Sequence, residues 1–297
     1  MRVFITGGSG FVGSAVVQEL INAGHQVLAL ARSEPTANAL AEAGAEVHPG
    51  DLEDLDSLKS GVAVSDAVIH AGFVHDFSDF VRACETDRRA IETFGEVLTG
   101  SDRPLIVTSG LGLLAPGRIA TEEDVAPPVS PSWPRASETT ALSLISHRVN
   151  ASVIRLSPSV HGEGDHGFVP MLIDLAREKG VSAYVGDGSN RWAGVHRLDA
   201  ARLYRLALEQ ASAGAIYHGA ADEGVAFRDL AEVIGKRLNV PVVSKSFEEA
   251  AEHFGWLGYF AGMDIAASSQ MTQERLDWHP AQLGLLADID HERYFRS

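Results

Sequence analysis

The chain has one cysteine, few basic residues and no long hydrophobic run, and each shortage excludes a class of protein. Cys84 has no partner for an internal disulfide, so nothing implies an oxidising compartment. No stretch approaches the ~18 apolar residues that span a bilayer, and the first residues lack the apolar core of a signal peptide. The chain has 24 Lys and Arg against 40 Asp and Glu, and its net charge of −16 would repel phosphate backbones and anionic lipids. We therefore expect a cytoplasmic α/β enzyme that binds neither nucleic acid nor membranes.

The first half of the chain alternates short apolar runs with helical patterns. Strands are expected over residues 3–5, 25–30, 45–47, 67–70, 104–108 and 151–156, and helices over 11–23, 37–43, 55–61, 79–98 and 137–148. This alternation predicts right-handed βαβ crossovers and a parallel sheet that helices cover on both faces. The proline-rich residues 115–134 are expected to form a surface loop.

Beyond residue 160 the regular alternation ends. Four further helices are expected over residues 168–178, 199–212, 226–237 and 246–254, with one strand over 216–218. The 297 residues allow one large domain or two modest ones. The predicted fold is a Rossmann-type, doubly wound α/β domain of residues 1–160 plus the strand near 215–218. Residues 161–297 mainly build a smaller, discontinuous substrate-binding lobe.

A glycine-rich turn follows the first expected strand and opens the first expected helix. Gly7 permits the tight turn, Gly10 lets the backbone approach a pyrophosphate, and Gly13 lets the helix pack close to the sheet. The positive end of that helix, which includes Phe11 and Val12, would point at the phosphates. The strand before the glycines and the amphipathic helix after them favour dinucleotide binding over a plain structural turn.

The GxxGxxG spacing resembles the extended and atypical short-chain dehydrogenase/reductase superfamily, which includes NAD-dependent epimerase/dehydratases and 3β-hydroxysteroid-dehydrogenase-like proteins. Further segments resemble this superfamily in the same chain order: Asp51-Leu52, His70-Ala71-Gly72, Thr108-Ser109-Gly110, Arg155 to Gly162, Val195 to Ala201 and Leu276 to Pro280. The resemblance implies that Asp51 and Leu52 read the adenine edge and that Ser109 is the active-site serine. It also implies that the nicotinamide ribose lies against the backbone of Ala71, Gly72 and Phe73.

The end of the second strand predicts the choice of dinucleotide. NAD-specific sites place an acidic residue there to bind the ribose 2′-hydroxyl. This chain has Arg32 and Ser33 instead, a cation and a hydroxyl that suit a 2′-phosphate. We therefore expect NADP(H) as the cofactor in preference to NAD(H).

The sequence departs from the superfamily where the chemistry usually lies. The superfamily's catalytic pair is Tyr-x-x-x-Lys, but none of the five tyrosines has a lysine four residues later: 184, 204, 217, 259 and 294. No tyrosine or lysine occurs between residues 109 and 178. Alignment on the superfamily's helix puts Pro134 at the tyrosine position and Glu138 at the lysine position. The resemblance is therefore to an atypical member, for which the standard proton relay does not carry over.

Two residues are candidates for the missing chemistry. Ser109 would donate a hydrogen bond to the substrate oxygen, with strand-end capping as the alternative. His75, on the loop after the fourth strand, titrates near neutral pH and would supply the proton directly or through a water; a solvated loop histidine is the alternative. In a third account solvent protonates the product, while Arg135 or backbone amides stabilise the oxyanion.

Other polar and aromatic residues have two readings each. His161, Asp165 and His166 form a substrate-contact cluster or a turn, and no metal is expected because further ligands at suitable spacing are missing. His70 is expected to pack against the sheet. An aromatic cluster either lines an apolar substrate pocket or forms the core of the lobe: Phe254, Trp256, Tyr259 and Phe260.

These observations predict an NADP(H)-dependent oxidoreductase of the atypical short-chain type. It would transfer a hydride to or from a small carbonyl or alcohol. One alternative is a redox sensor that binds the dinucleotide without turnover. Another is an NAD-dependent sugar epimerase or dehydratase. The substrate is not named by the sequence, and a homodimer stays open.

Overall fold

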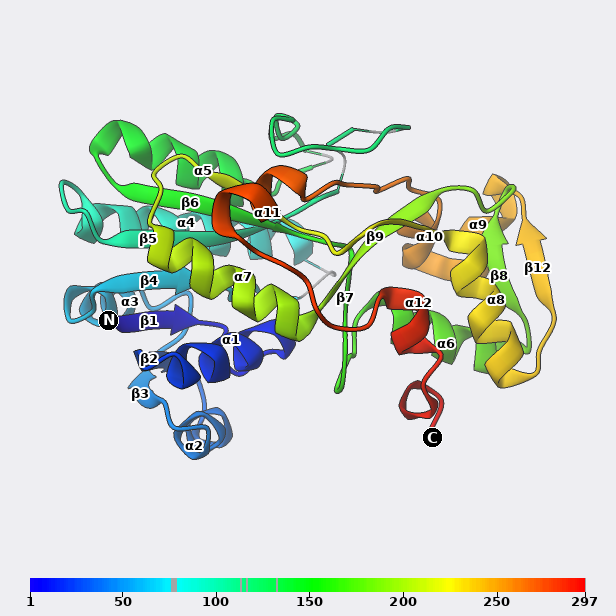
Figure 1. The fold of residues 1–297 in the computed structure, drawn as a ribbon, viewed down its shortest axis with the longest axis horizontal. Coiled ribbons are helices and arrows are strands. Elements are labelled where there is room, and N and C mark those ends of the chain that lie inside the picture. Colours follow the sequence, from blue (N-terminus) through cyan, green and yellow to red (C-terminus); the bar gives the residue numbers. More distant parts are fainter. Residues whose placement is uncertain (76–78, 113, 116, 132, 297) are drawn as a thin grey trace.

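A seven-stranded parallel sheet forms the larger of two lobes (Figure 1). The structure is a computed structural model that describes residues 1–75, 79–112, 114–115, 117–131 and 133–296. The strand order is β10-β6-β5-β4-β1-β2-β3. The strands are β1 (Arg2–Thr6), β2 (Gln26–Ala31), β3 (Glu46–Pro49), β4 (Ala67–His70), β5 (Pro104–Gly110), β6 (Asn150–Leu156) and β10 (Ile216–Gly219). The chain order reverses between β1 and β4, which is the switch point where doubly wound sheets bind ligands.

Helices cover both faces of this sheet, as expected for a doubly wound fold. One face packs against α1 (Phe11–Asn22), α2 (Glu34–Glu42) and α7 (Arg197–Gln210). The other face packs against α3 (Leu55–Ala63), α4 (Phe80–Leu98) and α5 (Ser137–Ser143). Successive residues of β1 show the alternation: Ile5 lies in the first core and Phe4 in the second.

The smaller lobe contains two short sheets. One has the order β11-β9-β7 and the other pairs β12 with β8. Its strands are β7 (Ser159–His161), β8 (Ser182–Val185), β9 (Arg191–His196), β11 (Asp222–Ala226) and β12 (Val242–Lys245). Its helices are α6 (Phe168–Lys179), α8 (Phe227–Leu238), α9 (Phe247–Phe254), α10 (Gly258–Ala261) and α12 (Leu285–Ile289). A separate apolar core that includes Trp192 and Phe227 holds this lobe together.

The elements expected in the first half of the chain are present, with ends within three residues except at one helix. The helix expected over residues 137–148 ends at Ser143 and continues as a 3-10 turn over Leu144–His147. The predicted strand near 216–218 is β10, beside β6 in the large sheet. The chain also returns to the large lobe with α7 and with α11 (Gln270–Leu276), which packs on α7 and β10. The described part of the 115–134 segment is irregular, with single bridges such as Ala120 to Ala267.

The five strands of the smaller lobe were not expected from the sequence. They are short, and β11 is mostly polar and partly exposed, so a clear alternation of apolar and polar residues is missing. Their pairing depends on segments far apart in the chain: β7 pairs with β9, which begins 30 residues later. Such strands are set by tertiary packing rather than by local pattern.

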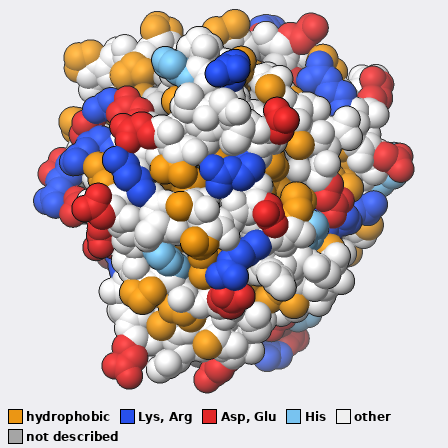
Figure 2. All heavy atoms as spheres, turned by 90° about the vertical axis from the view of Figure 1, so that its left-hand side faces the viewer, with side chains coloured by type: hydrophobic (Ala, Val, Ile, Leu, Met, Phe, Trp, Pro, Cys, Tyr) orange, Lys and Arg blue, Asp and Glu red, His pale blue; other side chains and the backbone are white. Residues whose placement is uncertain are grey.

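The outer end of the large lobe carries mixed charges. Figure 2 shows basic and acidic side chains side by side on this face, with hydrophobic side chains in small separate groups. Among the described residues, no helix is both long and apolar enough to cross a membrane.

Candidate functional site

The glycine-rich turn lies at the switch point of the sheet, between β1 and α1. Gly7 has a φ of +72°, and a Cβ there would lie 2.6 Å from the backbone of Gly72. A Cβ at Gly13 would lie 1.9 Å from the carbonyl oxygen of Gly7, whereas at Gly10 the nearest atom is that oxygen at 3.2 Å. Gly7 and Gly13 are thus required by packing. Gly10 precedes α1 without a side chain to cap it, so the N–H groups of the first turn, including those of Phe11 and Val12, can hold a phosphate.

Four predicted cofactor residues follow the carboxyl ends of β2 and β3, which are neighbours in the sheet. Arg32 is exposed, and its guanidinium has no ion-pair or hydrogen-bond partner among the described residues. Ser33 Oγ caps α2 by accepting from Thr36 N at 3.4 Å. Asp51 Oδ1 accepts from two backbone N–H groups of the following turn, at 2.8 and 3.0 Å, and Leu52 is half-buried. The carboxyl ends of these two strands therefore present an exposed cation and an ordered acidic turn.

The segment after β4 packs directly against the glycine-rich turn. The N–H groups of Ala71 and Gly72 donate to the carbonyl oxygen and to Oγ1 of Thr6, at 3.3 and 3.2 Å. The guanidinium of Arg135 lies over the ring of the next residue, Phe73, 4.6 Å from the ring centre. The backbone expected to line the nicotinamide side thus lies beside both an aromatic ring and a cation.

The two predicted catalytic residues lie at or beyond the carboxyl ends of the neighbouring strands β5 and β4. Ser109 lies near the end of β5 and is half-buried, and its hydroxyl has no hydrogen-bond partner among the described residues. His75 lies beyond β4, with its ring 5.5 Å from that of Phe73. Desolvation, and then the charge of Arg135, lower the pKa of His75 from its ordinary value. Both residues lie at the carboxyl edge of the sheet, and their direct contact stays a prediction.

Glu138, which the sequence analysis aligned with the superfamily's lysine, is held in a buried ion pair. Arg155 is fully buried, and its Nε and Nη2 donate to the two carboxylate oxygens of Glu138 at 2.8 and 2.6 Å. Arg155 also contacts His218 Nε2 at 3.1 Å and donates to the carbonyl oxygen of Asp124 at 2.7 Å. The carboxylate on α5 therefore neutralises the arginine of β6, a role that a lysine at this position could not perform.

A buried polar chain behind the site was missed by sequence reasoning. His70 packs within the sheet, and its ring hydrogen-bonds to Thr6 Oγ1 at 2.7 Å and to Asp87 Oδ1 at 3.1 Å. Asp87 Oδ2 accepts from Ser137 Oγ at 2.7 Å, and Ser137 in turn accepts from Arg135 Nε at 3.1 Å. Burial alone would raise the pKa of Asp87, but these hydrogen bonds and charges hold it below its usual value. The available signal was an aspartate on the buried face of an amphipathic helix.

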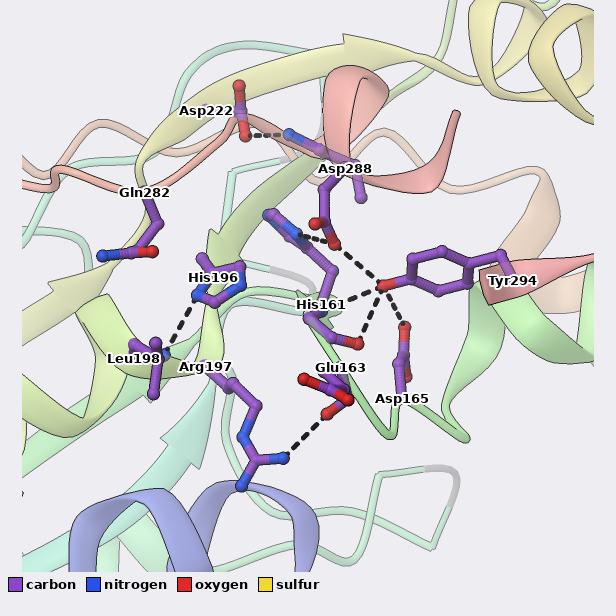
Figure 3. A network of polar contacts seen from close by, with 12 residues as sticks. His161, Glu163, Asp165, His196, Arg197, Leu198, Asp222, Gln282, Asp288 and Tyr294 are labelled. Carbon is purple, nitrogen blue, oxygen red and sulfur yellow. Dashed lines mark hydrogen bonds and ion pairs between the residues drawn. The ribbon is translucent and has the colours of Figure 1, made fainter. Parts of the chain in front are cut away.

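His161 and Asp165 belong to a buried network at the junction of β7 with the C-terminal segment (Figure 3). His161 Nδ1 lies 3.0 Å from Asp288 Oδ2, and the Tyr294 hydroxyl donates to the same oxygen at 3.0 Å. In Figure 3 this hydroxyl points between Asp288 and Asp165, whose Oδ2 lies 3.4 Å away, and it accepts from Gly162 N at 2.9 Å. A tyrosine hydroxyl has one proton, so it cannot donate to both carboxylates at once.

The pKa values of the two carboxyl groups in this network are shifted in opposite directions. Burial raises the pKa of Asp165 to about 6. Burial would also raise the pKa of Asp288, but hydrogen bonds from His161, Arg293 and Tyr294 outweigh it and hold that pKa below its usual range. Asp165 can therefore carry a proton toward Tyr294 while Asp288 stays ionised. The network ties the C-terminal segment to β7, which is a structural role that the sequence did not indicate.

His166 lies at the contact between the two lobes. Its ring is 5.6 Å from Phe11, edge to face, and the guanidinium of Arg197 lies 4.7 Å from the same Phe11 ring. Arg197 also donates to Ser14 Oγ and to the carbonyl oxygen of Glu163, each at 2.8 Å. Among the described residues, no group of three His, Cys, Asp or Glu side chains could hold a metal ion.

The aromatic cluster divides between the two readings. Phe254 is buried in the core of the smaller lobe. Phe260 stacks on Phe168 with 5.1 Å between ring centres, while Trp256 and Tyr259 are 49% and 61% exposed. Trp256 and Tyr259 also contact the Phe260 ring, so the cluster contains both buried and partly exposed rings.

Comparison with known proteins assigns the family. A family model described as "NAD dependent epimerase/dehydratase family" matches residues 3–95. The chain is 52% identical to an uncharacterised protein of Schizosaccharomyces pombe, covering 99% of this chain and 100% of that protein. It is 31% identical to the decarboxylating sterol-4-alpha-carboxylate 3-dehydrogenase of Dictyostelium discoideum, covering 76% of this chain and 73% of that enzyme. The chain belongs to the NAD-dependent epimerase/dehydratase family. This is a family of the short-chain dehydrogenase/reductase kind.

A solved structure confirms the fold class. The dTDP-glucose 4,6-dehydratase of Streptomyces venezuelae, crystallised with NAD, superimposes with a TM-score of 0.77 at 20% identity, covering 98% of this chain and 95% of that one. The predicted Rossmann-type fold is therefore confirmed, and the family model and the Dictyostelium relative confirm the predicted resemblance.

Proposed function

We propose that this protein is an NADP(H)-dependent oxidoreductase that acts on a small carbonyl compound or the corresponding alcohol. The observation that carries the proposal is the glycine-rich turn at the switch point. Gly7 and Gly13 are fixed by packing there, and Gly10 leaves the first turn of α1 open. Membership of the family supports dinucleotide chemistry.

The preference for NADP(H) rests on Arg32. Its exposed guanidinium follows β2, where an NAD-specific site would place a carboxylate, and no described residue pairs with it. A free cation can pair with the 2′-phosphate, whereas the 2′-hydroxyl of NADH offers it no charge. Ser33 contributes through the cap of α2, which orders the chain beside Arg32.

The bound dinucleotide supplies the hydride, and residues of this chain hold the substrate oxygen and deliver a proton. Ser109 would hold the oxygen through its hydroxyl, which bonds to none of the residues that the structure describes. A serine hydroxyl is too weak an acid to protonate an alkoxide, so His75 donates the proton directly or through a water. The lowered pKa of His75 makes its protonated form the stronger acid, so proton donation is favoured once the ring is charged.

The buried pair of Glu138 and Arg155 supports a second candidate from another class. Because that pair occupies the lysine position, the protein would lack a standard relay and would bind NADP(H) as a redox sensor without turnover. An epimerase or dehydratase that retains NAD is the third candidate, in keeping with the family description.

A panel of ketones and aldehydes with NADPH, followed at 340 nm, separates these candidates. The oxidoreductase proposal expects steady consumption of NADPH with at least one carbonyl compound. Tight NADPH binding without consumption would instead establish the sensor. Retention of NAD through purification, with no preference for NADPH, would favour the epimerase or dehydratase.

A further inference from the structure

Arg135 is a half-buried cation whose terminal amino groups have no partner among the described residues. Its Nε donates to Ser137 Oγ at 3.1 Å, and its guanidinium lies over the Phe73 ring. The nearest carboxylate along its contacts is that of Asp87, which it reaches only through Ser137. No described residue accepts from Nη1 or Nη2, and both groups can donate to a ligand.

Arg135 lies at the proposed reaction centre. Phe73, beneath its guanidinium, directly follows Gly72, and the backbone of Gly72 packs against Gly7. The charge of Arg135 also reaches His75, because it contributes to the lowering of that pKa. A ligand bound by Arg135 would thus lie beside the cofactor turn and the proposed proton donor.

Arg197 provides an internal contrast. It also lies over a phenylalanine, at 4.7 Å from the Phe11 ring centre, but both of its terminal nitrogens are occupied. Nη1 donates to the carbonyl oxygen of Glu163 and Nη2 to Ser14 Oγ. Arg197 is therefore committed to the junction of the lobes, whereas the two terminal groups of Arg135 contact no acceptor in the described part of the chain.

We propose that Arg135 binds a carboxylate of the substrate, so that the substrate is an oxo acid and its reduced form a hydroxy acid. The two terminal N–H groups of a guanidinium match the two oxygens of a carboxylate, while a neutral carbonyl oxygen would use only part of that fork. Reduction would consume one oxo acid, one NADPH and one proton and would yield the hydroxy acid and NADP⁺. The inference rests on the proposed function for the reaction, but not for the binding.

The surrounding residues hold the fork in place before a ligand arrives. Ser137 and Asp87 are 1% and 2% exposed, so the acceptor of Arg135 Nε cannot move away. Phe73 covers one face of the guanidinium. A guanidinium fixed in this way loses little side-chain entropy on binding, which favours a specific anion site. The site also gives a chain of net charge −16 a local cation to attract an anionic substrate.

The test compares acids with their esters. NADPH-dependent reduction of benzoylformate, its methyl ester, acetoacetate and its ethyl ester is measured with wild type, Arg135→Gln and Arg135→Lys. Arg296→Gln, which removes an exposed cation far along the chain, is the matched control. We expect wild type to prefer each acid, and Arg135→Gln to lower kcat/KM for the acid about 10- to 100-fold, chiefly through KM. The esters should lose much less than the acids, because for them only the charge that Arg135 places near His75 changes, and Arg135→Lys should recover part of the loss with the acids.

The outcomes separate this inference from the proposed function. Preference of wild type for the esters, or equal losses with acid and ester in Arg135→Gln, would overturn the carboxylate site while leaving the oxidoreductase intact. If no compound is reduced, calorimetric titration of benzoylformate into the NADP⁺-saturated protein decides. Binding by wild type but not by Arg135→Gln would support the carboxylate site without turnover, and no binding by wild type would overturn it.

Discussion

Replacement of Glu138 by glutamine tests the buried pair that this carboxylate forms with Arg155. The glutamine keeps the size of the side chain but removes the negative charge, and its NH₂ group faces the donors of Arg155. Arg155 would then be fully buried with an uncompensated charge. Loss of one partner of a buried pair costs about 3–5 kcal/mol. At roughly 2 °C per kcal/mol for a chain of this size, Tm should fall by ~6–10 °C.

Thermal unfolding followed by circular dichroism measures this loss. The matched control is Glu96→Gln, which breaks a pair with Lys59 of 2.9 Å whose two side chains are exposed to solvent. Exposed pairs contribute little, so its Tm should change by roughly 2 °C or less. Equal shifts for Glu138→Gln and Glu96→Gln would refute the account of the buried pair. Glu138→Lys, which introduces the superfamily's lysine, should be less stable than Glu138→Gln because it buries two cations together.

Three further changes test the cofactor site, the proton donor and the buried network. Arg32→Ala should weaken NADPH binding about 10- to 100-fold, measured by calorimetry, and leave NADH affinity nearly unchanged. His75→Phe should lower turnover about 10²- to 10⁴-fold with NADPH affinity intact. Asp165→Asn should gain stability relative to wild type as the pH rises. In wild type the pKa of Asp165 is raised from 3.8 to about 6. The folding stability of wild type should therefore fall by up to about 3 kcal/mol as the pH rises from 3.8 to 6, because Asp165 ionises less readily in the folded than in the unfolded chain.

Each of these expectations has a contrary result. An equal loss of NADPH and NADH affinity in Arg32→Ala would remove Arg32 from 2′-phosphate recognition, with Arg296→Ala as the control for charge. A His75→Phe variant that keeps more than about a tenth of wild-type turnover would leave solvent as the proton donor. A stability difference between wild type and Asp165→Asn that is the same at pH 4.5 and pH 7.5 would contradict the raised pKa.

The local signals in the sequence were sufficient to predict the large lobe. Gly7 and Gly13 are required because a side chain at either position would clash with nearby backbone. The clash at Gly13 is with Gly7, and the clash at Gly7 is with Gly72, just after the neighbouring strand β4. Apolar strands and amphipathic helices also carry their own patterns, so the sheet and its flanking helices could be placed in advance.

The contacts that build the site could not be predicted in the same way. Glu138 meets Arg155 across two elements, and His161 meets Asp288 across 127 residues, so neither pair follows from spacing. The series of hydrogen bonds from His70 through Asp87 and Ser137 to Arg135 likewise joins β4, α4 and α5. A pattern of apolar positions does not predict which polar side chains meet. These contacts depend on the packed tertiary structure. Sequence analysis therefore proposed His75 as the proton donor and named Arg135 only in an alternative account.

Calorimetric titration of the protein with NADPH and, separately, with NADH tests the central claim most directly. The account predicts that NADPH binds with 1:1 stoichiometry and at least about tenfold more tightly than NADH, because only NADPH gives Arg32 a phosphate to bind. Tighter binding of NADH, or no binding of either dinucleotide, would contradict it.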